Sequence, residues 1–326
     1  MHTMLRLKMT SFKDHQVHDK VHLSCMDLED VIDRLYIMRK QEKNRYAPKD
    51  YLSNPLKGEG KHCLSKNNIA KGNNVVDEFC REQIVEWSFR VVDYFRINRE
   101  VVAISTSYLD RFLATCSCDR KTFKLAATTA LNLAVKLNES TKTDMMSVLS
   151  ELSRGEFSMS DIVEMEQTMI ESLSWLLHPP TPKCILGYML KLLPSTVIPS
   201  LIRSISALSS FFTELSLCDY YFTTQYPSTV ALAAILNSME ILNLSEISSN
   251  IHNSFLDQLS VIIDVHYESE EVLEARKRLW IVYERSEEFT IQSDKAYSNN
   301  KHTRAFLQKN RRSTRNHQSP VSVSRN

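Results

Sequence analysis

The strongest constraint on the fold comes from residues 81–139, where charged side chains are set within long apolar stretches. Residues 108–113 place Asp110 and Arg111 side by side in the middle of a predicted apolar helix. The stretch before it begins with Arg81, and the stretch after it ends near Lys136. A charge buried alone in apolar surroundings is too costly to keep, so each of these must be paired or directed at a partner. The pattern favours a helical binding module over a catalytic pocket.

Composition narrows the fold class further. The 326 residues are enough for two domains of ordinary size, and the apolar fraction of 43% is that of a globular protein. There are only 5 glycines, and sheet-rich folds use more glycines in their turns, so the composition favours an all-α fold. The net charge of +1 gives no large field to attract nucleic acid, so we expect no direct nucleic-acid partner.

Cysteine use and hydropathy indicate where the chain is expected to work. The 7 cysteines are odd in number and scattered, which is typical of reduced thiols and not of a disulfide framework or a zinc site. No uncharged apolar run approaches the roughly 20 residues that a membrane helix needs. The first 26 residues are polar and lack the apolar core of a signal peptide. We therefore expect a protein of the nucleus and cytoplasm with no membrane partner.

Apolar periodicity predicts two tandem sets of five helices. The first set covers 77–96, 99–115, 120–137, 144–152 and 158–178, and the second covers 183–193, 198–218, 227–242, 251–265 and 268–286. The expected domains are therefore 76–178 and 183–288, joined by a proline linker at 179–182. A helix over 26–43 and a loop precede them within 26–75. Residues 1–25 and the basic tail 289–326 have no apolar period and are predicted to be disordered.

Local signals support several of these helix boundaries. Asn98 and Asp119 are good N-caps, Ser158 and Asp161 have capping-box spacing, and Thr181 precedes a proline that can open a helix. The stretch 120–137 is apolar nearly all round and rich in alanine, which predicts a central helix that its neighbours approach closely. In the stretch 77–96, the expected buried face consists of Ile84, Trp87, Val91 and Phe95.

These segments resemble a known family. Residues 81–87, 108–113, 134–139 and 165–166 resemble, in order and spacing, the cyclin box, and residues 38–52 resemble the N-terminal helix and turn of the same family. The linker at 177–182 is similar to that of D-type cyclins, and 226–234 resembles a core helix of the second cyclin fold. The resemblance implies two tandem five-helix cyclin folds. It also implies a regulatory subunit, not an enzyme, that binds and activates a cyclin-dependent protein kinase in cell-cycle control.

The resemblance assigns roles to four charged residues. Arg81 and Asp110 match the family's internal ion pair between two helices, and removal of one partner would strand a charge at a cost of about 3–5 kcal/mol. Lys136 and Glu166 match the Lys and Glu with which cyclins hydrogen-bond the backbone of the kinase. The alternative for Lys136 and Glu166 is a solvated pair at a helix end, worth at most about 1 kcal/mol.

A substrate-docking patch is a further implication of the resemblance. Ile84 and Trp87 fit the apolar patch that recruits Arg-x-Leu substrates in many cyclins. Cys80, Gln83 and Arg90 depart from the family pattern, and the positive charge of Arg90 opposes a cationic motif. The sequence therefore predicts weakened recruitment of Arg-x-Leu substrates, with Trp87 serving partly as core packing.

Weaker motifs lie near the chain ends. Leu23, Cys25 and Asp27 come close to the Leu-x-Cys-x-Glu motif of D-type cyclins, which implies a retinoblastoma-like pocket protein as a partner; the last residue is one methylene short. Residues 304–307 resemble a degradation box, and the basic cluster at 309–315 is consistent with either nuclear localisation or a solvated tail.

Other functional classes were weighed against this one. The sequence contains no GxGxxG, GxxxxGK[ST], HExxH or GxSxG motif, so we expect no catalytic residues, no cofactor and no metal site. One alternative is a cyclin-fold transcription factor of the general initiation type, which would need basic faces on both lobes. Another is a transcriptional or metabolic cyclin whose abundance does not oscillate.

Overall fold

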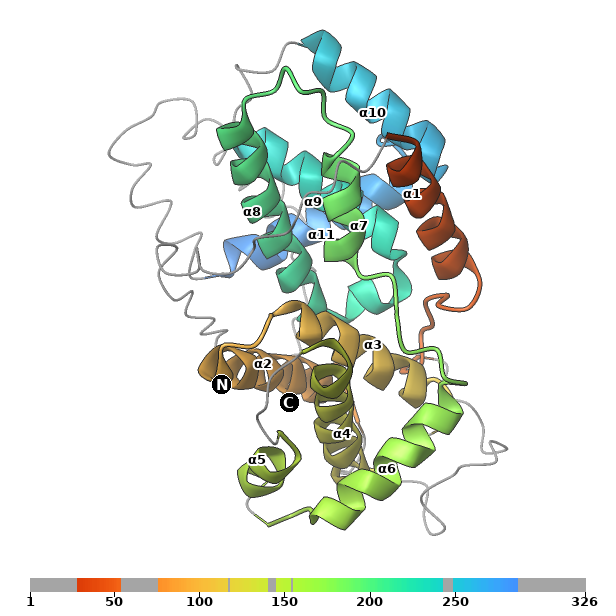
Figure 1. Cartoon of the computed structure of the whole chain (residues 1–326), viewed down its shortest axis with the longest axis vertical. Helices are drawn as coiled ribbons and strands as arrows, with labels where there is room; N and C mark the ends of the chain where they lie inside the picture. The colour runs from red at the N-terminus through yellow and green to blue at the C-terminus, as the bar shows by residue number, and fades with distance from the viewer. Residues whose placement is uncertain are drawn as a thin grey trace, which may run out of the picture.

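The described part of the chain is entirely helical and forms two lobes. The computed structural model describes residues 28–53, 76–116, 118–139, 145–153, 155–242 and 249–286. Within these ranges it contains eleven α-helices, one 3-10 helix and no strand. Helices α2–α6 form the first lobe, drawn at the bottom of Figure 1, and α7–α11 form the second lobe above it. The predicted pair of five-helix folds is confirmed.

The first lobe is built around one buried helix. Its helices are α2 (Glu78–Phe95), α3 (Glu100–Leu113), α4 (Arg120–Asn138), α5 (Met145–Leu152) and α6 (Met159–Ser172). Helix α4 is buried at every position from Ala126 to Val135 and packs against the other four. Small side chains let the neighbouring backbones approach closely, so the alanine-rich stretch became the centre of the lobe as predicted.

The second lobe repeats this plan. Its helices are α7 (Pro182–Leu190), α8 (Pro199–Leu217), α9 (Pro227–Ile241), α10 (Ser249–Ile263) and α11 (Glu270–Glu284). Helix α9 is buried at every position from Ser228 to Met239, which makes it the counterpart of α4. The 3-10 helix η1 (Tyr220–Thr224) joins α8 to α9, and the apolar period did not indicate it.

Most predicted caps are present. The side chains of Asp119 and Thr181 each accept a hydrogen bond from the backbone N–H three residues on, and Ser158 and Asp161 form a complete capping box. Asn98 lies one residue further out than expected. Helix α3 begins at Glu100, and the Asn98 side chain accepts the backbone N–H of Glu100 at 2.9 Å.

One predicted boundary and one predicted face are wrong. Helix α6 ends at Ser172 and not at residue 178, because Ser174 and Trp175 adopt left-handed backbone angles (φ 52° and 61°) that reverse the chain. On α2 the most deeply buried side chains are Val85, Phe89 and Val92. Three of the four residues of the expected face are only half-buried at its edge: Ile84, Trp87 and Phe95.

The first described helix, α1 (Leu28–Lys43), belongs to the second lobe in space. Val31, Leu35 and Met38 share one apolar core with α7–α11, and α1 lies beside α7 and α10 in Figure 1. Residues 44–53 then run to the first lobe, where Tyr51 enters the other core. Residues 28–53, which we call the strap, therefore connect both lobes.

A buried polar cluster fixes the strap to the second lobe. The fully buried carboxylate of Glu42 accepts the backbone N–H of Ser228 at 2.9 Å, in the first turn of α9, and also accepts the Ser228 hydroxyl. Arg39 pairs with Glu42 at 2.6 Å and lies over the ring of Tyr226. The N-cap residue of α9, Tyr226, makes no capping hydrogen bond with its side chain. Glu42 therefore caps α9 from a distant part of the chain.

The substitution Glu42→Gln is therefore expected to loosen the strap. It removes the negative charge that faces Arg39 and the N-terminus of α9, which we expect to cost about 2 kcal/mol of the free energy of unfolding. Hydrogen exchange in α1 should accelerate, as measured by mass spectrometry. Glu29→Gln, at an exposed position of the same helix, is the matched control and should change stability by less than about 0.5 kcal/mol. Equal protection of α1 in both variants would contradict this role of Glu42.

Several sequence predictions fall outside the described residues. These are the pocket-protein motif of Leu23, Cys25 and Asp27, the segments 1–25 and 289–326, and the motifs at 304–315. Among the helices that the structure describes, none has the length and hydropathy to cross a membrane.

Candidate functional site

Arg81 and Asp110 form the ion pair expected between the first two helices of the lobe. Arg81 Nε and Nη2 donate to the two carboxylate oxygens of Asp110 at 2.9 and 2.8 Å, and Arg81 is only 3% exposed. The third arm reaches the second lobe, where Nη1 donates to the carbonyl oxygen of Leu217 at 2.7 Å. The hydroxyl of Tyr51, from the strap, donates to Asp110 at 2.9 Å. The buried guanidinium of Arg81 thus connects α2 to α3 and to the second lobe. Its partner Asp110 also binds the strap, through Tyr51.

The electrostatics of this cluster favour the charged pair. Burial of the Arg81 guanidinium acts against its charge, but the Asp110 carboxylate and its hydrogen bonds outweigh that effect and raise the pKa of Arg81. Burial, together with the neighbouring Asp110 charge, raises the pKa of the Tyr51 hydroxyl, which therefore stays a neutral donor. Arg81, Asp110 and Tyr51 thus satisfy one another's charges and hydrogen bonds, which is the geometry of a structural ion pair.

Lys136 and Glu166 lie together on a different face of the first lobe. Lys136 Nζ, in the last turn of α4, lies 2.7 Å from Glu166 Oε1 on α6. The amide of Asn132 donates to the other Glu166 oxygen at 3.3 Å. The Lys136 side chain is 58% exposed, whereas that of Glu166 is 13% exposed. The Glu166 carboxylate is therefore oriented by two side chains of α4, and the ammonium group of Lys136 is accessible to solvent.

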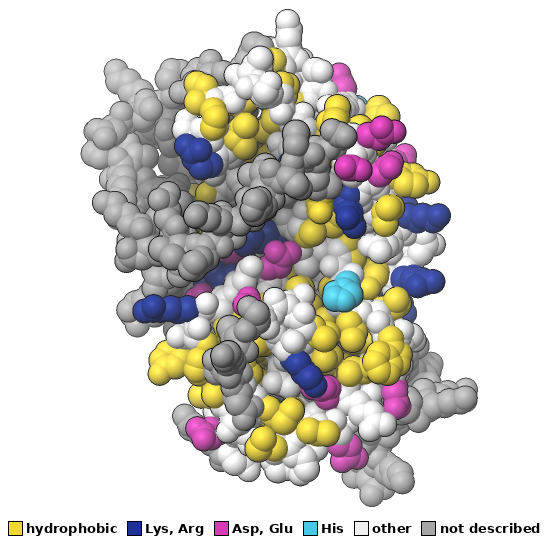
Figure 2. Space-filling model, viewed as in Figure 1, with side chains coloured by type: hydrophobic (Ala, Val, Ile, Leu, Met, Phe, Trp, Pro, Cys, Tyr) yellow, Lys and Arg dark blue, Asp and Glu magenta, His cyan; other side chains and the backbone are white. Residues whose placement is uncertain are grey.

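Exposed apolar side chains lie on the same helices as this pair. Met159 and Val163 are exposed and precede Glu166 by seven and three residues, so the three share one face of α6. Leu137, next to Lys136 on α4, is also exposed, as is Leu152 at the end of α5. Figure 2 shows hydrophobic side chains gathered over the lobe that contains these helices. We call Leu137, Met159 and Val163, with Lys136 and Glu166, the α4–α6 face.

Trp175 is an exposed aromatic residue that the sequence analysis missed. It follows α6 directly, its side chain is 74% exposed, and its left-handed backbone conformation is uncommon for a residue other than glycine. Together with Ser174, this conformation reverses the chain after α6. Helical periodicity could not indicate the direction of its side chain, because α6 ends three residues earlier, at Ser172.

The predicted substrate-docking residues lie elsewhere, on α2. Ile84 and Trp87 are half-buried and pack against the core of the first lobe, and Arg90 is exposed close by on the same helix. Ile84 and Trp87 thus lie on α2, whereas Lys136 lies on α4 and Glu166 on α6. Nothing in this geometry assigns them a ligand.

Family comparisons agree with this architecture. The model of the cyclin N-terminal domain family matches residues 33–178, and that of the cyclin C-terminal domain family matches residues 180–310. The two matched segments cover both helical lobes and the linker between them, in the order in which they occur in the structure. The chain therefore belongs to the cyclin family.

Similar proteins in the curated collections are mitotic and plant cyclins. The chain is 28% identical to "Cyclin-B2-2" of Oryza sativa subsp. indica over 57% of this chain and 43% of that protein. It is 30% identical to "G2/mitotic-specific cyclin-B2" of Oryzias luzonensis over 56% and 46%, respectively. With "Cyclin-B2-2" of Arabidopsis thaliana it shares 25% identity over 81% and 58%. The chain spans about half the length of these relatives.

A solved structure supports the fold. The chain resembles a viral cyclin from herpesvirus saimiri with a TM-score of 0.51 and 18% sequence identity, covering 64% of this chain and 87% of that one. At that level of identity the similarity concerns the arrangement of the helices. The likeness of the linker to D-type cyclins stays a prediction.

Proposed function

We propose that the chain is a regulatory subunit that binds and activates a cyclin-dependent protein kinase through the α4–α6 face. The observation that carries this proposal is the Lys136–Glu166 pair, which joins α4 to α6, the two helices that also carry the exposed apolar side chains of Leu137, Met159 and Val163. A solvated surface pair would not need exposed apolar side chains on the same helices. Apolar area provides binding free energy, and an oriented ammonium–carboxylate pair provides directional hydrogen bonds to a partner backbone.

The proposed activation is a shift between two kinase conformations. Protein kinases need a Lys–Glu ion pair and a correctly placed metal-binding Asp, and the position of one mobile helix controls both. A partner that binds the active arrangement more tightly stabilises it. Taking a kinase from 1:99 to 99:1 needs about 5.5 kcal/mol of differential affinity, which a broad interface with a few central residues can provide. The chain itself contributes no catalytic group.

The cellular role follows from the same proposal. We propose a role in cell-division control, which the name of its relative "G2/mitotic-specific cyclin-B2" supports, and a location in the nucleus and cytoplasm. Affinity capture of the full chain from dividing cells, followed by identification of the co-purifying kinase, tests this. We expect a cyclin-dependent kinase that gains activity when the purified chain is added. Capture without any protein kinase would reject the proposal.

Trp175→Ala should weaken kinase binding. Trp175 is an exposed tryptophan three residues after the end of α6, and tryptophan is enriched among interface hot spots, so its loss is expected to weaken the affinity about 30-fold. Surface plasmon resonance with the captured kinase measures this. Tyr94→Ala is the matched control, since Tyr94 is 80% exposed on α2 and lies outside the α4–α6 face. Equal affinities for both variants would exclude Trp175 from the interface.

A further inference from the structure

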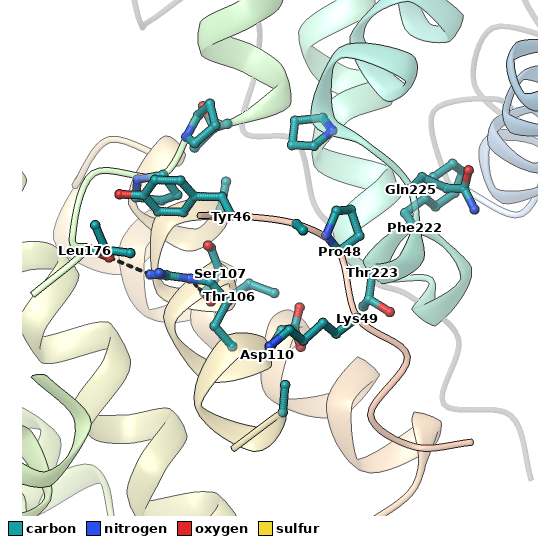
Figure 3. A pocket seen from close by; sticks show the side chains of 18 of the residues that line it. Tyr46, Pro48, Lys49, Thr106, Ser107, Asp110, Leu176, Phe222, Thr223 and Gln225 are labelled. Atoms are coloured by element: carbon teal, nitrogen blue, oxygen red, sulfur yellow. Dashed lines mark hydrogen bonds between the residues drawn. The ribbon is translucent and has the colours of Figure 1, made fainter. Parts of the chain in front are cut away.

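A cleft lies between the two lobes, beneath the strap. Its volume is about 350 Å³. Figure 3 shows Tyr46, Pro48 and Lys49 of the strap running between α3 and the η1 region of the second lobe. Ligand sites occur preferentially at domain junctions and have volumes of roughly 300–1,000 Å³. This cleft is at the small end of that range, so it fits a side chain or two better than a large molecule.

Arg111 is the unusual residue of this cleft. Its Nη2 donates to the carbonyl oxygen of Leu176 at 2.7 Å, the contact drawn as a dashed line in Figure 3, and its Nε donates to that of Ser107 at 3.2 Å. The guanidinium also stacks 4.7 Å from the ring centre of Tyr46. These partners are neutral, and Arg111 forms no ion pair with any residue that the structure describes. Burial lowers the pKa of Arg111, whereas Arg81 nearby is fully paired with Asp110.

The other charged residues that line the cleft add to its excess of positive charge. Arg45 and Lys49 are exposed on the strap side, and neither forms an ion pair within the described ranges. Asp110 is the only acidic residue among those that line the cleft, and Arg81 and Tyr51 already bind its carboxylate. The cleft therefore carries an uncompensated positive charge, and a cation removed from water without a counter-charge is energetically costly.

Hydroxyl groups and apolar walls complete the surroundings. Thr106 and Ser107 on α3 and Thr223 on η1 line the cleft, and Pro48 and Phe222 provide apolar surface. The hydroxyl of Thr223 donates to the carbonyl oxygen of Tyr220 at 2.8 Å, whereas those of Thr106 and Ser107 can donate to an anion. The apolar walls suit the carbon part of a side chain that carries such an anion. We propose that the interlobe cleft binds the anionic side chain, acidic or phosphorylated, of a segment of a protein partner, with Arg111 at its base and Arg45 and Lys49 at its rim. The proposal does not depend on kinase binding.

Small aromatic anions test the proposal directly on the full chain. Benzoate and phenyl phosphate carry the carboxylate and phosphate on an apolar body, and benzamide is the neutral counterpart. Titrations followed by amide NMR should shift the signals of Ser107 and Thr223 with both anions and leave them unchanged with benzamide. The tighter anion tells whether the natural side chain is acidic or phosphorylated.

Charge reversal at the rim provides the matched comparison. Arg45→Glu with Lys49→Glu leaves Arg111 and its structural hydrogen bonds in place and should weaken anion binding about tenfold. Arg34→Glu with Lys40→Glu makes the same charge change at exposed positions of α1 outside the cleft and should bind as the unmodified chain does. Unshifted signals with both anions, an equal response to benzamide, or equal affinity in the two double variants would each overturn the proposal.

Discussion

Replacing both Lys136 and Glu166 with alanine is expected to lower kinase activation by the chain about 100-fold while the protein stays folded. Truncating a hydrogen-bonded charge pair at an interface costs about 2–5 kcal/mol of binding, and 1.4 kcal/mol corresponds to a factor of ten. Within the folded chain the loss is small. Lys136 is mostly exposed, and Asn132 loses only a 3.3 Å hydrogen bond, so the free energy of unfolding should fall by about 1 kcal/mol.

The lobe contains a matched control for this experiment. Lys124 on α4 and Glu156, just before α6, form another exposed ion pair at 3.3 Å. Alanine at both positions removes the same charges from the same lobe and should leave activation unchanged. The measurement is the phosphorylation rate of the captured kinase against chain concentration, with circular dichroism as the check on folding. Equal activation by the two double variants would exclude the α4–α6 face as the activating surface.

The substitution Arg81→Met should destabilise the protein by about 3–5 kcal/mol. It leaves the largely buried carboxylate of Asp110 without its guanidinium and the Leu217 carbonyl without its donor. Because that carbonyl belongs to the second lobe, the change also removes a tie between the lobes. Urea unfolding measures the loss, and Lys277→Ala, which breaks an exposed pair with Glu274, should cost less than about 1 kcal/mol.

A second substitution separates the stranded charge from a simple loss of packing. Adding Asp110→Leu to Arg81→Met removes the unpaired carboxylate as well, so the double variant should be more stable than Arg81→Met alone. If Arg81→Met were within 1 kcal/mol of the unmodified chain, or if the double variant were the less stable of the two, the pair would not have the structural role assigned to it.

Helix content and order could be predicted from the sequence because they depend on local patterns. The alanine-rich period of α4 and the caps at Asp119, Ser158 and Thr181 act within a few residues, and each was found where expected. The predicted end of α6 was wrong because the apolar residues Leu176 and Leu177 continue the helical pattern in the sequence. The chain has already reversed at Ser174 and Trp175. Glycine is the usual sequence signal for such a left-handed turn, and neither of these residues is glycine.

The candidate site was predicted only in part. Lys136 and Glu166 could be selected because the family resemblance pointed to them, but the exposed Met159 and Val163 beside them could not be distinguished from core residues by type. The predicted buried face of α2 was displaced because the true face includes Arg81. A search for apolar periodicity assigns a charged residue such as Arg81 to the exposed face, because it does not know that Asp110 pairs with it.

Taken by itself, the amino-acid order determined two helical lobes, their central helices and the linker between them, because hydrophobic periodicity and capping are short-range properties. Only the tertiary structure decided which lobe α1 joins, that Glu42 caps α9 from 186 residues away, and that Arg81 reaches the second lobe. It alone also revealed the unpaired charge of Arg111 in the cleft. The energy of a buried charge depends on what surrounds it, and those surroundings come from residues far apart in the chain.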